Sequence, residues 1–288
     1  MIAADLIVID RPTITAPLGV QFWDRVQDIP IGEGLDVVAF PTGHPEYQTA
    51  GVANTVGVYV FHHLPGLRAF ETGGGNVTPR AFVIQVRDPS GSFLPCTFGV
   101  TAPQVGLAPF ACGSPIQSPA VPLYSAPTRK TPAGMAVVRA DLLDTSLPPK
   151  GRPAAWAVLE ARIDGALAAR GVADDQGRVV LFFAYPEPTG FAAGSPLGPG
   201  GRALTDQMWT LNVSAAYAPA GALTPTLSQG ARELPDQCAT LNQPPAILWS
   251  DAAQTLHLTQ LTLRFGQELI ARSDALPNLL ITPTGSPV

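Results

Sequence analysis

Apolar and polar residues alternate with a period of two along most of the chain, and extended stretches with a helical period of 3.6 are hard to find. Such alternation is typical of strands that bury one face. The segments that we predict to be strands are 55–61, 81–87, 92–94, 135–143, 154–163, 166–173, 178–185, 207–217, 254–265 and 268–272. The pattern therefore predicts an all-β protein.

Short turn sequences separate several of these strands. The run Asp88-Pro89-Ser90-Gly91 predicts a hairpin between 81–87 and 92–94, because Pro presets φ and Gly accepts a positive φ. Asp164-Gly165 predicts a two-residue hairpin, and 174–177 predicts the next tight turn. We therefore expect residues 154–185 to form an antiparallel meander whose one face is covered by another sheet. The pair Gly266-Gln267 predicts a last hairpin.

Segments rich in Pro, Gly and Ser divide the chain. Residues 103–134 and 218–245 are predicted to be extended arms, and 187–202 a loop. The domains expected are an N-terminal β-rich domain over 1–102, an arm or linker over 103–134, a β-sandwich core over 135–187, and a C-terminal β-rich region over 188–288 able to complete a sandwich.

Charged residues are scarce. The chain has 17 Lys+Arg and 22 Asp+Glu, or 14% charged residues, whereas about 25% is typical of soluble domains. A net charge of -5 gives no electrostatic basis for binding nucleic acid. The uncharged stretch 89–128 is long enough to span a bilayer, but its eight prolines exclude a lipid-exposed helix, so no membrane insertion is expected.

Long neutral stretches bury well against neighbouring subunits, because they carry little desolvation cost. The stretches 89–128, 207–231 and 275–288 therefore favour a subunit of a larger assembly, and a monomer with neutral loops is the alternative. The N-terminus lacks the basic start of a secretion signal, and Cys96, Cys112 and Cys238 form no CxxC pair. We expect three reduced, packed thiols in a cytoplasmic protein.

Searches for catalytic signatures give nothing: there is no GxSxG, GxxxxGK[ST] or HExxH motif, and we expect no enzyme, cofactor or metal. His62 and His63 end a predicted strand, so their rings should point to opposite faces, one packed and one solvated, and not share an ion. Asp174 and Asp175 are better explained by turn hydrogen bonds than by acid–base catalysis. Gly73-Gly74-Gly75 precedes no predicted helix and is not expected to bind phosphate.

The four tryptophans divide into two pairs. Trp156 and Trp209 fall in predicted strands and are expected in the core. Trp23 and Trp249 fall in less regular segments, and we take them as candidate contact residues.

The segment from Arg170 to Leu181 resembles the hairpin motif of the carboxypeptidase-regulatory-like, or transthyretin-like, β-sandwich family. The residues that carry the resemblance are Gly171, Asp174 and Gly177, and the likeness covers about residues 133–187. It implies a prealbumin-like antiparallel sandwich, a module that is not itself catalytic.

A wider resemblance is carried by the segments 57–68, 93–95, 121–129, 154–160 and 185–188. They are similar to proteins of contractile injection system clusters, which encode phage-tail-like particles built of sheath, tube, baseplate and cap. The resemblance implies a non-enzymatic subunit at a particle end. A cap or cap adaptor is favoured, and a baseplate protein is the alternative. It implies a homo-oligomeric ring that contacts other particle subunits. Assembly would take place in the cytoplasm, and later release as part of an extracellular particle is left open.

The sequence thus leads to one principal hypothesis and one alternative. The principal hypothesis is a structural subunit whose neutral arms, 103–134 and 218–245, clasp its neighbours by adding strands or by extended docking. The alternative is a monomeric sandwich that binds a carbohydrate or a protein, using Trp23 or Trp249.

Overall fold

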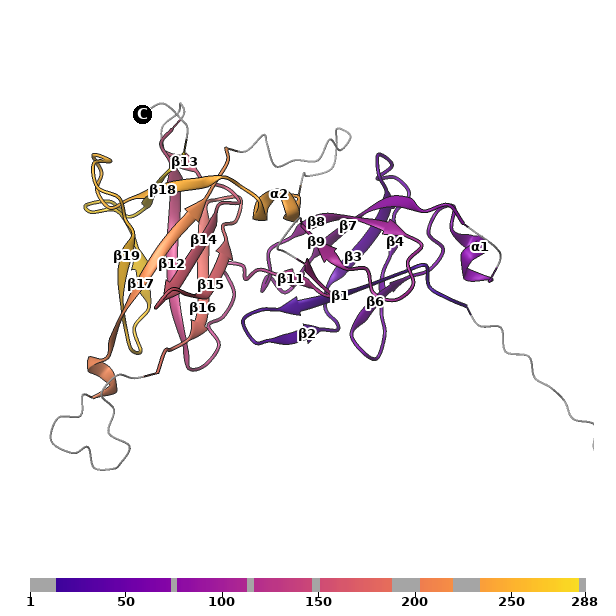
Figure 1. The fold of residues 1–288 in the computed structure, drawn as a ribbon, viewed down its shortest axis with the longest axis horizontal. Helices are drawn as coiled ribbons and strands as arrows, with labels where there is room; N and C mark the ends of the chain where they lie inside the picture. The colour runs from indigo at the N-terminus through magenta and orange to yellow at the C-terminus, as the bar shows by residue number, and fades with distance from the viewer. Residues whose placement is uncertain are drawn as a thin grey trace, which may run out of the picture.

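The structure is a computed structural model, and it describes residues 14–73, 77–112, 117–146, 151–187, 203–219 and 234–284. Two β lobes lie side by side, and the short helix α2 (Gln237–Leu241) sits between them (Figure 1). We call the part up to β11 the N lobe and the part from β12 onward the C lobe. The described chain is almost entirely strand and turn, so the predicted all-β class is confirmed.

The N lobe is a sandwich of two sheets. One sheet has the order β11-β1-β6-β5, with β2 beside β1, and the other has the order β4-β3-β7-β8. The strands are β1 (Leu18–Asp24), β2 (Ile29–Ile31), β3 (Asp36–Pro41), β4 (Thr49–Ala50), β5 (Val52–Ala53), β6 (Val58–Phe61), β7 (Arg80–Arg87), β8 (Cys96–Ala102), β9 (Phe110–Ala111), β10 (Gln117–Ser118) and β11 (Val121–Leu123). The helix α1 (Arg68–Glu71) lies at the end of the lobe farthest from the C lobe (Figure 1).

Alternating side chains from both sheets fill the space between them, as strand periodicity requires. Leu18, Val20 and Phe22 of β1 are fully buried. The Phe22 ring contacts Tyr59 edge-on at a centroid distance of 5.3 Å, and it lies 6.4 Å from Phe98 of the other sheet. Aromatic side chains therefore fasten the two sheets of this lobe to each other.

The hairpin predicted around residues 88–91 exists, but its second strand starts later than expected. Cys96 of β8, not residue 92, faces Val86 of β7. The intervening loop is held by the Asp88 carboxylate, which accepts hydrogen bonds from the Ser92 and Phe93 amides at 2.7 and 2.9 Å. The loop residues pair elsewhere, since Phe93 bridges to Ser125.

Residues 103–134 were predicted to be an arm or a linker, and their described part forms no free arm. Ala108, Phe110 and Cys112 are buried in the N-lobe core, and β11 pairs in parallel with β1. Only the last part of this segment, after β11, connects the two lobes. The prolines of this segment predicted an irregular arm. Proline is nevertheless tolerated in an edge strand such as β11, so its presence did not exclude a place in the N-lobe core.

The C lobe is one long sheet that curls on itself, in the order β13-β12-β21-β18-β17-β14-β15. Strands β16 and β20 also pair with β12, and β19 pairs with β17. The strands are β12 (Met135–Asp144), β13 (Arg152–Pro153), β14 (Val158–Ile163), β15 (Ala166–Val172), β16 (Arg178–Ala184), β17 (Met208–Ala216), β18 (Pro245–Trp249), β19 (Gln260–Arg264), β20 (Leu269–Ala271) and β21 (Leu279–Pro283), and the 3-10 turn η1 (Leu204–Asp206) precedes β17.

The two regions predicted as 135–187 and 188–288 share one hydrophobic core. Leu142, Leu159 and Leu181 pack in the same cluster as Leu211 and Ile281. The C-terminal region therefore completes the sandwich, and the boundary at 187 is not a boundary between folding units. Residues 188–202 of the predicted loop 187–202 and residues 220–233 of the second predicted arm lie outside the described residues.

Local turn and periodicity signals were reliable in this lobe. Asp164 and Gly165 both have positive φ, 50° and 82°, as the two-residue turn between β14 and β15 requires. In β17, Trp209, Leu211 and Val213 are buried while the residues between them are exposed. Trp209 is thus a core residue, as expected.

The predicted partners of two strands are wrong. β16 follows a tight turn after β15 but forms its ladder with β12, Met135 facing Ala184, so the expected three-stranded meander does not form. The last predicted hairpin also fails, because β19 pairs with β17 and β20 pairs with β12. A turn shows where the chain reverses, but closure of the sheet around the core decides which strand is the neighbour.

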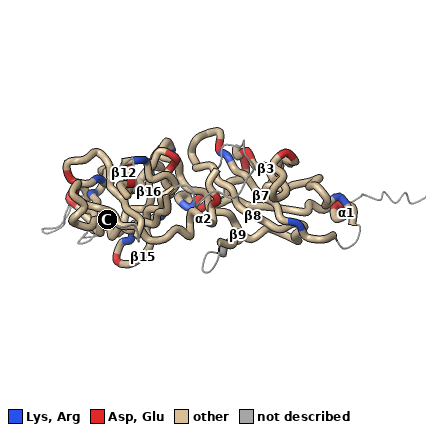
Figure 2. Tube along the Cα trace, turned by 90° about the horizontal axis from the view of Figure 1, so that it is seen from above, with Lys and Arg blue, Asp and Glu red and all other residues tan. Residues whose placement is uncertain are grey.

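Charged side chains are few and scattered over both lobes, and most of the trace carries neither sign (Figure 2). Within the described residues, no helix is long and apolar enough to cross a membrane.

Candidate functional site: the junction between the lobes

A short segment of the C-lobe chain lies against the N lobe. Residues 234–243, between β17 and β18, contain α2, and we call them the strap. Asp236 caps α2, because its carboxylate accepts a hydrogen bond from the Ala239 amide at 2.7 Å. The amide of Thr97 in β8 donates to the Pro235 carbonyl at 2.9 Å. The strap is therefore an extra partner at one end of β8.

Side chains of the strap reach the N lobe at further points. Gln237 donates from Nε2 to the Pro122 carbonyl, and Asn242 donates from Nδ2 to the Cys112 carbonyl at 2.9 Å. Cys112 and Cys238 form a disulfide across 126 residues of sequence. The prediction of three reduced thiols is therefore wrong for this pair, while Cys96 is free and buried as expected. The spacing of the cysteines held no sign of the pairing, because the fold alone brings them together.

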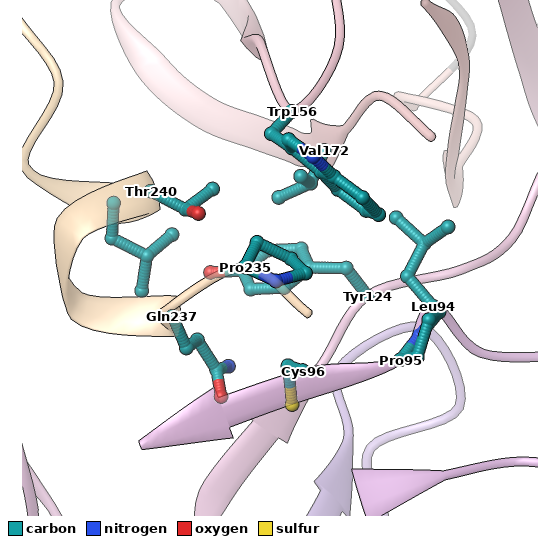
Figure 3. A pocket seen from close by; sticks show the side chains of 10 residues that line it. Leu94, Pro95, Cys96, Tyr124, Trp156, Val172, Pro235, Gln237 and Thr240 are labelled. Carbon is teal, nitrogen blue, oxygen red and sulfur yellow. The ribbon is translucent and has the colours of Figure 1, made fainter. Parts of the chain in front are cut away.

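Apolar side chains of both lobes meet under the strap (Figure 3). Leu94, Tyr124 and Ala126 form a buried cluster with Val158 and Val172 of the C lobe. Figure 3 shows Leu94, Tyr124 and Val172 of this cluster. The partly buried residues Trp156, Ala216 and Leu241 pack against this cluster. The free space left among these side chains is about 20 Å³, which holds about one water molecule. The junction is a packed contact and not a ligand cavity.

Trp156 lies at this junction and not in a strand, in contrast to the prediction. Its φ is 64°, and its carbonyl accepts a hydrogen bond from Nε2 of Gln243 in the strap at 2.7 Å. Gln243 also accepts from the Ala218 amide at 2.7 Å through Oε1. Its amide thus ties the end of the strap to the first C-lobe turn that faces the N lobe.

A second contact between the lobes is centred on Arg129. Its guanidinium forms a buried ion pair with Asp24 of β1 and donates to Ser125 Oγ at 3.0 Å. The guanidinium carbon lies 4.8 Å from the Phe93 ring centroid and 6.0 Å from that of Phe182 in the C lobe. A buried ion pair with aromatic neighbours defines one arrangement of its partners, so this contact orients the connector between the lobes.

Burial holds the Cys96 thiol and the Tyr124 phenol at the junction in their neutral forms. Complete burial raises the pKa of the Cys96 thiol to about 12, with the nearby Asp236 carboxylate adding to the shift. Burial likewise raises the pKa of Tyr124. A thiol with so high a pKa is not a nucleophile near neutral pH, because the thiolate is the reactive form.

The predicted hairpin motif serves the C-lobe fold. The Asp174 carboxylate accepts from the Gln176 and Arg178 amides, both at 2.9 Å, and pairs with the Arg178 guanidinium. A Cβ on Gly171 would lie 2.7 Å from the Val180 carbonyl, and one on Gly177 would lie 2.4 Å from the Leu142 carbonyl. The turn interpretation of Asp174 is therefore confirmed, and both glycines are required by close approach of the backbone.

The two candidate contact tryptophans differ in exposure. Trp249 lies in β18 with 5% of its surface exposed, and its Nε1 donates to Thr282 Oγ1 at 2.9 Å, so it cannot serve as a surface contact. Trp23 lies in β1, is partly exposed, and donates from Nε1 to Asp28 at 3.0 Å. Only Trp23 remains a candidate contact residue.

The histidine pair is arranged differently from the prediction. Both rings lie beside the buried Glu71 carboxylate, with Nδ1–oxygen distances of 3.8 Å for His62 and 3.2 Å for His63. His63 has a φ of 60°, which turns the chain out of β6, so the two side chains do not alternate as in a strand. No group of three or more potential metal ligands is gathered within the part of the chain that the structure describes.

A polar groove of about 500 Å³ opens next to the Arg129 contact. Its lining includes Ser90, Ser92, Phe93, Thr128 and Lys130. Hydroxyl groups beside one aromatic ring are a combination that can bind a polar ligand.

Comparisons with known proteins identify no family. No protein-family model matches the chain, and no curated protein matches it. One solved structure, described as "The Bacillus anthracis TIE protein", aligns over 94% of this chain with 8% identity and a TM-score of 0.24. The alignment covers 34% of that protein, so this chain spans about a third of its length. A likeness at this TM-score supports no statement about fold or function.

Proposed function

We propose that this chain is a non-enzymatic structural subunit of a contractile, phage-tail-like injection particle. It would lie at a particle end and form a ring with other copies. We favour a cap or cap adaptor over a baseplate protein. The observation that carries the proposal is the junction, where the strap, the disulfide and the Arg129 contact tie two sandwiches to each other, as a spacer between other subunits would require.

Two further properties support this role. The small number of charged residues, 14% of the chain, lowers the cost of burying large areas against neighbouring subunits. The disulfide between Cys112 and Cys238 is compatible with a particle released into oxidising surroundings. The described part of 103–134 is built into the N lobe and the connector, so it does not act as a free arm that clasps a neighbour.

The test is to tag the protein in its own host, purify what accompanies it and image the product by negative-stain electron microscopy. We expect rod-shaped particles labelled at one end, and the labelled end distinguishes a cap from a baseplate. A monomer without particles would contradict the proposal. A strap variant, Gln237→Ala with Cys238→Ser, should reduce incorporation, whereas the exposed Val56→Ala should not.

The polar groove favours one second candidate, a module that binds a carbohydrate. In that case the isolated protein should bind glycans as a monomer, and Lys130→Ala or Ser92→Ala should weaken binding in a glycan array. Trp249→Phe should leave such binding unchanged, because Trp249 is buried away from solvent.

A further inference from the structure

The outer edge of β8 has an open half. The amide of Thr97 points away from β7, because it bonds to Pro235 of the strap. Backbone groups two residues apart in a strand point the same way, so Gly99 and Thr101 also direct their N–H and C=O groups outward. Among the described residues, β8 pairs with β7 and, through Thr97 alone, with the strap. The edge is therefore unpaired from Gly99 to Thr101.

A groove of about 420 Å³ runs along this open edge. Its lining comes from β8 (Gly99–Thr101), from the segment after β8 that includes Gln104 and Ala108, and from Ala81 and Phe82 of the neighbouring β7. None of the residues that line it carries a charge, and a Cβ at Gly99 would meet nothing within 4 Å. Val105, next to Gln104, is 93% exposed. An uncharged groove beside free backbone groups fits an extended apolar peptide that adds a strand.

The N-terminal segment of the chain has the sequence that this groove requires. Residues 1–13 lie outside the described residues, and they include the uninterrupted apolar run Leu6-Ile7-Val8-Ile9, flanked by Asp5 and Asp10. A run of four residues is long enough to pair with the open part of β8. The exposed Arg80, which faces Ala102 at the end of the edge, offers a partner for one flanking aspartate.

The start of the described chain lies where this segment can reach another molecule. Ile14 is 60% exposed, and the Thr15 amide donates to the Glu71 carbonyl of α1 at 3.3 Å. The chain therefore leaves the N lobe at its tip, far from the C lobe (Figure 1). Thirteen extended residues span at most about 45 Å, so the segment can cross to an adjacent subunit.

We propose that the open edge of β8 accepts residues 1–13 of a second copy as an added strand, and that this exchange links neighbouring copies. The inference deepens the proposed role in a particle and rests on it. It places the contact between copies on the N lobe, and the junction between the lobes takes no part in that contact.

The oligomeric state of the full chain tests the exchange. We expect the chain to elute as a dimer or larger ring in light-scattering chromatography, and Thr101→Pro to elute as a monomer. The substitution removes an outward N–H without removing a bond to β7, so the lobe keeps its ladder. The matched control Thr101→Val keeps the N–H and should leave the mass unchanged. Equal thermal melts of the two variants confirm that both fold.

A peptide identifies the donor. An excess of a synthetic peptide of residues 1–13 should dissociate the oligomer, and a scrambled peptide should not. Two differently tagged chains, one carrying Ile7→Cys and the other Thr101→Cys, should form a disulfide cross-link between chains when mixed. A link only within one chain carrying both cysteines would overturn the proposal, as would an oligomer that resists both Thr101→Pro and the peptide.

The two proposals fail in different ways. Thr101→Pro that still enters particles like the unchanged chain would refute the strand exchange and leave the structural role intact. Absence of every variant and of the unchanged chain from particles would refute the structural role itself.

Discussion

Cys112 and Cys238 are joined by a disulfide across 126 residues, with their Cα atoms 4.8 Å apart. The bond fixes the strap of the C-lobe chain to the N lobe. We predict that Cys238→Ser lowers the free energy of unfolding by about 2–5 kcal/mol, a typical effect of losing a native disulfide. Thermal unfolding with and without a reductant measures it. The reductant should lower the melting temperature of the unchanged chain and not that of the variant; equal responses would contradict the assignment.

Gly171 lies where β15 approaches β16, and a Cβ there would be 2.7 Å from both the Val180 carbonyl and a Leu181 methyl. The carbonyl belongs to the backbone and cannot move aside. We predict that Gly171→Ala destabilises the chain by about 1–3 kcal/mol in urea unfolding. Gly99→Ala is the matched control, since a Cβ there meets no atom within 4 Å and the cost should stay below about 0.5 kcal/mol. Equal effects of the two would refute this explanation.

Arg129 and Asp24 are both buried, so removing one partner leaves an unpaired charge. We predict that Arg129→Met costs about 3–5 kcal/mol of stability. The half-buried pair of Arg162 with Glu160 supplies the control: Glu160 keeps its second partner Arg170, so Arg162→Met should cost less than about 1 kcal/mol. In a double-mutant cycle, adding Asp24→Asn should recover part of the loss. No recovery would show that the ion pair is not the cause.

The Asp144 carboxyl makes the folding stability of the C lobe depend on pH in the acid range. Burial acts to raise the pKa of its carboxyl, but hydrogen bonds from Ser146, Arg152 and Tyr217 outweigh burial and lower the pKa below its usual 3.8. A lowered pKa stabilises the fold above the unfolded value, and this stabilisation is lost as the pH falls through the folded value.

We therefore predict that stability falls as the pH drops below about 4, and that Asp144→Asn makes the urea midpoint lower near neutral pH but less dependent on acid. Midpoints measured from neutral to acid pH check this. The exposed Asp164→Asn serves as the control and should keep the slope of the unchanged chain. An unchanged slope in Asp144→Asn would contradict the role of this carboxyl.

Much of the local structure could be predicted from the sequence. The alternation of Trp209, Leu211 and Val213 predicted the buried face of β17, and Asp164-Gly165 predicted the turn before β15. The motif of Gly171, Asp174 and Gly177 predicted a tight turn, and the structure explains each residue by a hydrogen bond or a close approach. These features depend on neighbours within a few positions, so the sequence by itself determined them.

The junction was decided by tertiary structure alone. No local signal linked Cys238 to Cys112, Gln237 to Pro122 or Arg129 to Asp24. The pairing of β16 with β12 and the burial of Ala108, Phe110 and Cys112 could not be predicted either, because they also depend on residues far away in the sequence. Which distant segments pair depends on how the sheets close to bury the apolar faces of the whole chain. Such pairing is therefore a property of the complete fold and not of any short segment.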